Sequence, residues 1–440
     1  MKQMTTVLDF LTTHEPLTLD RVISKQITIG IIGLGYVGVP LALSFASQGV
    51  RVVGFDVDQT KVTMIQQGES YYKHICKKSF KPLTKKKLLS ATTDYQYISA
   101  CDAIIICVPT PLNENLEPDL QYIVQTCESI KPHIEPGTLV SLESTTWPGT
   151  VDEIVVPYFS EKQDIYVCYS PEREDPGNKD YNTKNIPKLL SGINRKSLEF
   201  GKALYALAID TVVPVKTTKA AEAAKLFENI FRSVNIALVN EMKIICDEMD
   251  IDVWEVLSAS STKPFGFMPF SPGPGLGGHC IPIDPYYLSW KARQYGINTR
   301  FIELAGEINR SMPKYVIAKV QDCLNLYEKS LKGSKILILG LAYKADIDDM
   351  RESPSLELMR LLTEKGARVS YYDPYLPTIP QNRKFQQFIG MQNTHPSSEY
   401  DCFLLATAHS CFSPQEFLSH GVPIVDTRNF FPAHDNVFRS

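Results

Sequence analysis

Residues 27–58, ITIGIIGLGYVGVPLALSFASQGVRVVGFDVD, decide the fold of this chain of 440 residues. A β-rich apolar run leads into Gly33, Gly35 and Gly38, and an apolar helical stretch follows these glycines. A second apolar run then ends at Asp56, about 20 residues beyond the glycines. The GxGxxG spacing alone is a weak signal. A strand before it, a helix after it and a trailing acid are together the context of a dinucleotide-binding turn.

Each residue type in this turn has a physical purpose. The glycines allow a tight turn, a close approach of the backbone to a pyrophosphate and close packing of helix on strand, while the helix N-terminus offers N–H donors. A carboxylate at Asp56 accepts from a ribose 2′-OH and repels a 2′-phosphate, which favours NAD over NADP. The alternative is a glycine turn in another kind of α/β domain. The residues expected to bind the cofactor here are Gly33, Gly35, Tyr36, Val37, Gly38 and Asp56.

Strand-like runs recur at residues 101–111, 137–146 and 164–172, with helical stretches between them. Such alternation implies a parallel sheet with both faces covered. Thr110 and Thr145 fall at the carboxyl ends of two of these runs, and open α/β sheets bind ligands at that edge. We therefore predict both threonines in the site, although an ordinary cap or turn is the alternative for either one.

An uninterrupted helical pattern runs from Thr218 to Asp252 without glycine or proline, and its apolar arc is wide. Lys225, Asn229 and Arg232 fall on one face of this pattern. A solvated stripe is one interpretation, and a cation with an amide donor aimed at a developing oxyanion is the other. The length of the helix between two α/β modules also suggests a dimer surface.

A second α/β module begins near residue 334, with a strand, a loop, a helix over about residues 353–364 and further strands. It repeats the strand–helix–strand order without the glycine fingerprint, so we do not expect it to bind a second NAD. Lys344, Arg351 and Arg428 fall at strand ends or in the loops that follow. Cations at such positions suit phosphates or a dinucleotide edge, and surface ion pairs are the alternative.

These patterns predict an α/β fold with two Rossmann-like doubly wound sheets, joined by a central helical domain that contains a long helix. The expected boundaries are 1–26 for an N-terminal extension, 27–214 for the NAD-binding domain, 215–330 for a central helical dimerisation domain and 331–440 for the second sheet domain. The segment PLTLDRVISKQ in the extension has no clear counterpart in this scheme.

The composition is that of an ordinary folded protein, with 44% hydrophobic and 21% charged residues. A net charge of −4, from 45 basic and 49 acidic residues, gives no global basic field, so nucleic acid is not an expected partner. No apolar run approaches the roughly 20 residues of a membrane span, and the N-terminus lacks a secretory apolar region. The ten cysteines form no CxxC pair and no cluster with histidine, which favours reduced thiols in a cytoplasmic enzyme without a metal site.

The stretch PGPGLGGHCIPIDPYYL, from Pro272 to Leu288, surrounds the thiol of Cys280 with residues that build neither helices nor strands. Glycine and proline fix the backbone where larger side chains would obstruct a ligand. A rigid loop around one thiol is typical of a nucleophile site, and Asp284 is near enough in sequence to hold a base or a water there. The alternative is a core thiol in a structural loop.

Eight motifs follow one another between Ile27 and Phe431, namely GLGYVG, VPTP, EST, SPE, AAKLFEN, GGHCIPID, YKADIDDMRES and DTRN. In these motifs and their order the chain resembles the nucleotide-sugar 6-dehydrogenases, the UDP-glucose and UDP-N-acetylhexosamine dehydrogenase family. The resemblance implies that residues 331–440 bind the UDP-sugar. It also implies that NAD oxidises the C6 alcohol to an aldehyde, that Cys280 adds to the aldehyde, and that a second NAD oxidises the adduct to a thioester, which water hydrolyses to the uronate.

The resemblance also implies roles for side chains by position. Lys225 and Asn229 are expected to steady the oxyanion, and Asp284, with a water near Thr145, to assist proton transfer. Glu172 is expected to assist hydrolysis of the thioester. The catalytic residues implied in this way are Cys280, Lys225, Asn229, Asp284, Thr145 and Glu172.

Binding residues follow from the same resemblance. Lys344 and Arg428 are expected to approach the sugar nucleotide, Arg351 the NAD, and Lys61 the adenosine ribose. The residues expected at the substrate are Glu172, Arg173, Lys225, Asn229, Gly275, Gly277, Lys344 and Arg428.

The chain departs from the family pattern at one place. The UDP-glucose branch has a second glutamate four residues after the glutamate that corresponds to Glu172, and this chain has Pro176 there. Glu174 and Asp175 are the neighbouring acids that could compensate.

The stretch FGFMPFSPGPGLGGHCIPIDPYYLSWKAR is similar to the bacterial branch that acts on UDP-N-acetylglucosamine and feeds O-antigen and capsule sugars. UDP-N-acetylmannosamine, UDP-GalNAc and UDP-glucose remain alternatives, because a few side chains decide whether an acetamido group fits. Alternatives of another class are a two-electron dehydrogenase of the 3-hydroxyacid type and a catalytically inactive sugar-nucleotide sensor. The expected assembly is a homodimer or a higher homo-oligomer.

Overall fold

The structure is a computed structural model that describes residues 14–72, 75, 79–113, 115–162, 164–175, 178, 180–278, 281–382 and 384–440. Its internal contacts divide the chain into two compact units. The first unit ends at Glu228 and also takes in Tyr286–Ile297, whereas the second consists of Asn229–Pro285 and Asn298–Ser440. The predicted domain boundaries at residues 27, 215 and 331 stay predictions.

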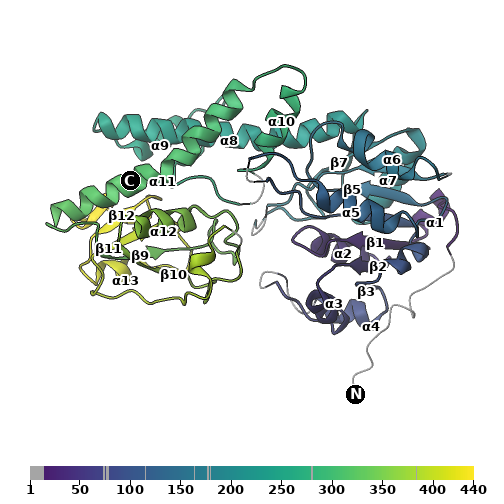
Figure 1. Cartoon of the computed structure of the whole chain (residues 1–440), viewed down its shortest axis with the longest axis horizontal. Helices are drawn as coiled ribbons and strands as arrows, with labels where there is room; N and C mark the ends of the chain where they lie inside the picture. Colours follow the sequence, from purple (N-terminus) through teal and green to yellow (C-terminus); the bar gives the residue numbers. More distant parts are fainter. Residues whose placement is uncertain are drawn as a thin grey trace. The chain divides into compact units, whose positions relative to one another are not determined.

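The first unit contains an eight-stranded sheet in the order β3-β2-β1-β4-β5-β6-β7-β8 (Figure 1). All five residues of β1 are buried, as expected for a strand that is covered on both faces. The strands are β1 (Thr28–Ile32), β2 (Arg51–Phe55), β3 (Leu89–Thr92), β4 (Ala103–Ile106), β5 (Leu139–Leu142), β6 (Tyr166–Tyr169), β7 (Lys188–Gly192) and β8 (Val212–Pro214).

One strand pair of this sheet differs from the predicted parallel arrangement. Neighbouring strands are parallel except β6 and β7, which pair antiparallel through Cys168 with Gly192 and Tyr169 with Ser191. A parallel connection needs a crossover element, and no helix occurs among the described residues between these two strands. The chain therefore turns back at the carboxyl end of β6, in the segment that contains the SPE motif.

Helices cover the first sheet, and its core is formed by apolar side chains such as Ile29, Val39, Phe45 and Val52, which are inaccessible to solvent or nearly so. Helix α3 packs on β3 and α7 packs on β6 and β7 (Figure 1). The helices are α1 (Leu19–Ile23), α2 (Gly38–Ser47), α3 (Gln59–Gln66), α4 (Phe80–Lys85), η3 (Tyr95–Ala100), α5 (Gln121–Ile130), η4 (Val151–Val155), α6 (Val156–Phe159) and α7 (Arg195–Tyr205).

The second unit contains a five-stranded, wholly parallel sheet in the order β10-β9-β11-β12-β13 (Figure 1). The predicted α/β fold with two Rossmann-like sheets is therefore confirmed. The strands are β9 (Lys335–Leu339), β10 (Arg368–Tyr372), β11 (Cys402–Leu405), β12 (Ile424–Asp426) and β13 (Val437–Arg439). The shorter helices that accompany this sheet are α12 (Pro354–Glu364), η5 (Gln386–Phe388) and α13 (Pro414–Leu418).

The central helical domain is present and contains the predicted long helix, α8 (Thr218–Glu248), which has 31 residues. The sequence pattern placed the end of this helix at Asp252. The helix ends earlier because Asp250 has a positive φ of 55° and the Asp252 carboxylate caps the next helix, α9 (Val253–Ser261), by accepting from Trp254 N. Helices α10 (Asp284–Arg293) and α11 (Arg300–Leu326) follow. In the described part of the chain, no helix is long and apolar enough to cross a membrane.

Candidate active site

The turn after β1 requires two of its three glycines. Gly33 has a φ of +91°, and a Cβ there would lie 2.7 Å from the Cys107 carbonyl oxygen. A Cβ on Gly38, where α2 begins, would lie 2.0 Å from the Gly33 carbonyl oxygen. At Gly35 a Cβ would meet no protein atom within 4 Å, so the backbone there is open to a ligand. This turn fits a pyrophosphate at the N-terminus of α2.

Asp56 directly follows β2 and closes this turn. Its Oδ2 accepts from Leu34 N at 2.9 Å, and its Oδ1 accepts from Asp58 N at 2.9 Å. The ammonium of Lys61, on α3, lies 3.2 Å from the same Oδ2. The sequence-predicted Asp56 and Lys61 are thus brought together. Tyr36 and Val37 lie in the same turn: the Tyr36 ring packs on Tyr72, with centroids 4.4 Å apart, and Val37 caps α2 through its backbone.

Thr110 and Thr145 are also brought together, at the carboxyl ends of β4 and β5. The Thr110 hydroxyl donates to the Thr145 carbonyl oxygen at 2.8 Å. The buried Tyr287, on α10, donates its hydroxyl to the Thr110 carbonyl oxygen at 2.9 Å. Tyr287 was not predicted from the sequence. Nothing in the tyrosine pair 286–287, which follows the loop around Cys280, indicates a contact with a strand end so far away in the chain.

Glu172 follows β6 and belongs to a buried ionic cluster. Its Oε1 accepts from Arg173 N at 2.6 Å and also from Glu174 N, so the carboxylate caps its own loop. The Lys188 ammonium, on β7, lies 3.8 Å from Glu172 Oε2 and 2.6 Å from Glu143 Oε2. A cation between two carboxylates favours the ionised form of both.

Glu143 is the second anion of this cluster, and sequence reasoning missed it. The Tyr205 hydroxyl, on α7, donates to Glu143 Oε1 at 2.6 Å, and the Ser141 hydroxyl lies 2.8 Å from the same Tyr205 oxygen. Burial raises the pKa of the Glu143 carboxyl, although Lys188 opposes this. Burial alone would lower the pKa of the Lys188 ammonium, but Glu143 and Glu172 together keep that pKa above its usual value. The signal in the sequence was an acid directly after an apolar strand.

Arg173, predicted at the substrate, is engaged within the first unit. Its Nη2 lies 2.8 Å from Glu228 Oε1, on α8, and its Nε donates to Glu228 Oε2 at 3.1 Å. This bidentate contact fixes the loop that carries Glu172 to the long helix. A substrate role for Arg173 stays a prediction.

Lys225 and Asn229 are buried on α8, one turn apart, and the predicted pair is therefore not a solvated stripe. Arg232, expected on the same face, is exposed instead. In the second unit the Asn229 amide donates to Asp284 Oδ2 at 2.5 Å. Two of the predicted catalytic side chains are thus in direct contact. Cys280 and Pro176 lie outside the residues that the structure describes.

The loop before Cys280 is anchored by buried amides. Gly273 N donates to Asn240 Oδ1, on α8, at 3.0 Å, and the Asn240 amide donates to Asn309 Oδ1, on α11, at 2.9 Å. A Cβ on Gly273 would lie 2.3 Å from Arg428 Nη1, and a Cβ on Gly277 would lie 2.7 Å from Tyr343 Cβ. The loop therefore depends on glycine for its close approach to both side chains. Asn240 and Asn309 had no sequence signal beyond being polar residues in apolar helices.

Arg428 follows β12 and is the second unit's candidate for binding an anion. Its Nε donates to the Ala406 carbonyl oxygen at 2.9 Å, and burial lowers the pKa of its guanidinium to about 10. Within the described residues no carboxylate lies at ion-pair distance from it. A desolvated cation of this kind suits a phosphate. Gly275, also predicted at the substrate, has a φ of +134° and lies in the same loop as Gly273.

Arg351 and Lys344 lie in the long loop after β9. The Arg351 guanidinium forms a bidentate pair with Asp349, with Nη2 2.7 Å from Oδ2, and its side chain is 45% exposed. This matches the surface ion pair that the sequence left open for Arg351, and a contact with NAD stays a prediction. Lys344 is half-buried next to Tyr343.

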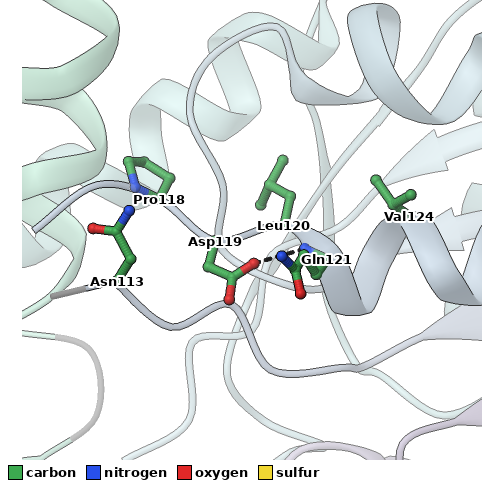
Figure 2. Close-up of a pocket in the computed structure, with 6 residues that line it drawn as sticks. All are labelled: Asn113, Pro118, Asp119, Leu120, Gln121 and Val124. Atoms are coloured by element: carbon green, nitrogen blue, oxygen red, sulfur yellow. Dashed lines mark hydrogen bonds between the residues drawn. The ribbon is translucent and has the colours of Figure 1, made fainter. Parts of the chain in front are cut away.

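A surface hollow of about 380 Å³ lies in the first unit, on the loop before α5 (Figure 2). The Asp119 carboxylate accepts from Gln121 N, the first residue of α5, at 2.9 Å there. None of the predicted site residues belongs to it. The residues that line the hollow are Asn113, Pro118, Asp119, Leu120, Gln121 and Val124.

Protein-family models match the three regions that contain the glycine turn, the long helix and the second sheet. Three models match, described as the NAD binding, central and UDP binding domains of the UDP-glucose/GDP-mannose dehydrogenase family, over residues 27–209, 219–311 and 337–433. The chain belongs to the UDP-glucose/GDP-mannose dehydrogenase family. The predicted family, the NAD cofactor and the UDP-sugar dehydrogenase class are therefore confirmed for this dehydrogenase.

Relatives of this dehydrogenase carry more than one substrate name. A UDP-N-acetyl-D-glucosamine 6-dehydrogenase of Pseudomonas aeruginosa is 35% identical over 88% of this chain and 92% of its own length. A UDP-N-acetyl-D-mannosamine dehydrogenase of Methanococcus maripaludis is 36% identical over 87% of this chain and 86% of its own length. The solved structure of a UDP-D-ManNAc dehydrogenase from Pyrococcus horikoshii covers 94% of this chain and 98% of its own, with a TM-score of 0.82 and 28% identity.

Proposed function

We propose that this dehydrogenase oxidises the C6 hydroxyl of UDP-N-acetylglucosamine to the carboxylate and so supplies a uronate for surface polysaccharide. The observation that carries the proposal is the buried pair of Asn229 with Asp284, with Lys225 one turn earlier on α8. These residues are a cation, an amide donor and a carboxylate, which are the groups that a carbonyl-forming oxidation needs. The 35% identical relative named for UDP-N-acetylglucosamine supports this substrate.

The glycine turn and Asp56 hold NAD, which supplies a hydride acceptor when bound. In the proposed chemistry the C6 alcohol loses a proton and a hydride and becomes an aldehyde. The Cys280 thiolate then adds to the aldehyde carbon, and a second loss of hydride from this adduct leaves a thioester. Water adds to the thioester carbon, the sulfur leaves, and the uronate is released.

The side chains of this dehydrogenase supply proton transfer and charge stabilisation in this sequence. We assign Lys225 and Asn229 to the oxygen that becomes negative as the tetrahedral adduct forms. Asp284 orients the Asn229 amide and, with a water, accepts a proton. Glu172, ionised beside Lys188, takes the proton of the water that attacks the thioester.

Arg428 and the glycines of the loop before Cys280 are proposed to hold the UDP part of the substrate. The guanidinium is desolvated and lacks an ion-pair partner within the described residues, so a diphosphate would supply the missing anion. Gly275 and Gly277 lie in the same loop and are half-buried. Replacing Arg428 with methionine should weaken UDP binding at least tenfold in calorimetric titration and leave NAD binding unchanged.

A panel of four sugar nucleotides tests the substrate. The initial rate of NADH formation is measured with UDP-N-acetylglucosamine, UDP-N-acetylmannosamine, UDP-GalNAc and UDP-glucose. We expect the highest kcat/KM with UDP-N-acetylglucosamine. A higher value for another hexose would overturn the substrate and keep the chemistry, whereas a rate only with a 3-hydroxyacid would support the two-electron alternative.

We also propose a homodimer formed through α8. Large apolar side chains are exposed along one stripe of this helix, at Phe227, Phe231, Leu238, Ile245 and Met249, with Phe227 68% exposed. Such a stripe is typical of a subunit interface. Sedimentation of the purified chain should give the mass of a dimer, and Leu238→Glu should shift this mass towards that of the monomer.

We also propose a cytoplasmic location, because the cysteines of the sequence show no paired spacing. Cell fractionation tests this location.

A further inference from the structure

The cluster around Glu172 holds more carboxyl groups than it can ionise together. Glu172 and Glu174 lie two residues apart in one loop, where Glu172 accepts from Glu174 N, and the buried Lys188 ammonium lies 2.6 Å from Glu143 and 3.8 Å from Glu172. The nearby Arg173 guanidinium is taken by Glu228. Like charges in a desolvated site cannot all be present, so one carboxyl should retain a proton.

The hydrogen bonds show which carboxyl that is. Glu143 faces the Lys188 ammonium at 2.6 Å and the Tyr205 hydroxyl at 2.6 Å. Glu172 accepts two backbone N–H groups and has the same ammonium 3.8 Å from its other oxygen. These donors stabilise the anionic forms of Glu143 and Glu172.

Glu174 has much less support as an anion. Its Oε1 accepts from the Thr183 hydroxyl, which is the one side-chain hydrogen-bond partner of this carboxyl among the described residues. Glu174 is half-buried. A single neutral hydroxyl does not offset this loss of solvent beside two anions.

We propose that Glu174 keeps a proton at neutral pH and thereby holds Glu172 as the ionised member of the pair, which makes Glu174 a positioning residue for the hydrolytic step. Only the assignment of that step rests on the proposed function. The pKa of Glu174 supports this charge state, since burial and then the negative charge of Glu172 raise it to about 8. The proton leaves the pair as pH rises through this value, and the pair titrates as a unit.

Other groups face this pair and must be separated from it in a titration. They are Glu143 at the end of β5, Lys188 on β7, Tyr205 on α7, and Cys107 after β4, whose thiol pKa burial raises well above its usual value. Elsewhere in the first unit, burial raises the pKa of Glu222 to about 7. Difference spectra between variants remove these shared contributions.

Infrared titration of the full chain without substrate tests the charge state directly. The carbonyl stretch of a protonated carboxylic acid is followed from pH 6 to pH 10 in the wild type, Glu174→Gln and Asp175→Asn. Asp175 is the matched control, because it lies in the same loop and its carboxylate accepts from the Asn178 amide instead. We expect a band with a midpoint of about 8 that is present in the wild type and Asp175→Asn and missing in Glu174→Gln. A band that Asp175→Asn removes, or spectra of the wild type and Glu174→Gln that coincide, would overturn the proposal.

The pH profile of uronate release from UDP-N-acetylglucosamine and NAD tests the positioning role. Ionised Glu174 would place a second negative charge beside Glu172, so Glu172 would no longer be the single anion of the pair, and the wild-type rate should fall about tenfold between pH 7 and pH 9. This decline should persist in Asp175→Asn and disappear in Glu174→Gln. An unchanged decline in Glu174→Gln would contradict the role. A positive infrared result with no turnover of any UDP-sugar would keep the charge state and reject the proposed function instead.

Discussion

Gly33 in the first unit and Gly340 in the second follow the first strand of their sheets in the same backbone conformation. Their φ angles are +91° and +83°, and a Cβ on either would lie within 3 Å of a carbonyl oxygen, that of Cys107 or of Thr407. The strand order agrees as well, because β2-β1-β4-β5 in one sheet corresponds to β10-β9-β11-β12 in the other. The two sheets therefore repeat one construction.

The acid at the end of the second strand is repeated too, but its surroundings differ. Asp56 accepts from Leu34 N, and Asp373 accepts from Leu341 N at 2.7 Å. Asp56 faces the partly exposed ammonium of Lys61, whereas Asp373 contacts the buried His409 ring, whose Nε2 lies 3.0 Å from its Oδ2. The side chain of Asp56 is 7% exposed, whereas that of Asp373 is inaccessible to solvent.

The segments after the two glycines complete the difference. Helix α2 begins at Gly38, so its N-terminus points at the first turn, whereas α12 begins only at Pro354. The intervening loop carries Lys344 and Arg351. The same strand-turn unit is therefore followed at once by a helix N-terminus in the first sheet, which suits a pyrophosphate, and by a long loop with two basic residues in the second.

The largest effect should come from adding a methyl group to either glycine turn. Gly33→Ala would place Cβ 2.7 Å from the Cys107 carbonyl oxygen at a φ of +91°, and relief of this overlap should cost about 3 kcal/mol, or roughly a 100-fold loss in NAD affinity. Gly340→Ala is the matched variant in the second sheet and should weaken binding of UDP instead. Calorimetric titrations with NAD and with UDP measure both. Loss of NAD affinity in Gly340→Ala would break the assignment of one ligand to each turn.

A smaller effect is expected from removing the charge of the sealed acid. Asp373→Asn deprives His409 of its anionic partner and should destabilise the chain by about 2–3 kcal/mol in urea unfolding. Asp56→Asn should cost about 1 kcal/mol, because Asp56 keeps its backbone donor and its partner Lys61 is partly exposed.

Asp373 should also make the stability of the chain depend on pH. Burial opposes ionisation of Asp373, but the hydrogen bond from His409 and backbone N–H donors hold its pKa below the usual value of 3.8. The stabilisation is therefore present above pH 3.8 and is lost as pH falls further. The acid limb of the stability curve should be shallower in Asp373→Asn, and an acid limb equal to that of the wild type would contradict this account.

The smallest effects concern the opposite edge of the sheets, where a third acid is repeated. Asp102 accepts from Thr28 N at 2.7 Å and Asp401 accepts from Lys335 N at 2.7 Å. Arg21, in the N-terminal extension, lies 2.9 Å from Asp102, and Lys329 lies 2.6 Å from Asp401.

Burial decides how much each of these ion pairs contributes. The Asp102 side chain is 2% exposed and that of Asp401 is 23% exposed. Arg21→Gln should cost about 2 kcal/mol, because it leaves a buried carboxylate without its cation, and Lys329→Gln should cost less than about 1 kcal/mol. Equal losses for the two variants in thermal unfolding would show that the extension does not complete the first sheet as Lys329 completes the second.

Sequence reasoning identified the parts of the molecule that local pattern determines. The glycine turn, Asp56, the strand ends at Thr110 and Thr145, and the second sheet without a fingerprint were all visible, because each depends on neighbours in the chain. The antiparallel β7 was not visible, because it depends on the absence of a crossover rather than on any residue type.

The long-range contacts of the site could not be predicted for a related reason. Lys188, Tyr205 and Glu143 come from separate elements, and only the sheet order brings them together. The extension around Arg21 had no counterpart in the sequence pattern, and its purpose becomes clear only beside the buried Asp102. Pairings of this kind are set by tertiary packing, which periodicity does not encode.

The most direct test of the central claim is the number of NADH molecules formed for each uronate released from UDP-N-acetylglucosamine. Four-electron oxidation through a thioester on Cys280 predicts two, and Cys280→Ser should stop release of the acid. One NADH for each product molecule, or full acid production by Cys280→Ser, would contradict the account.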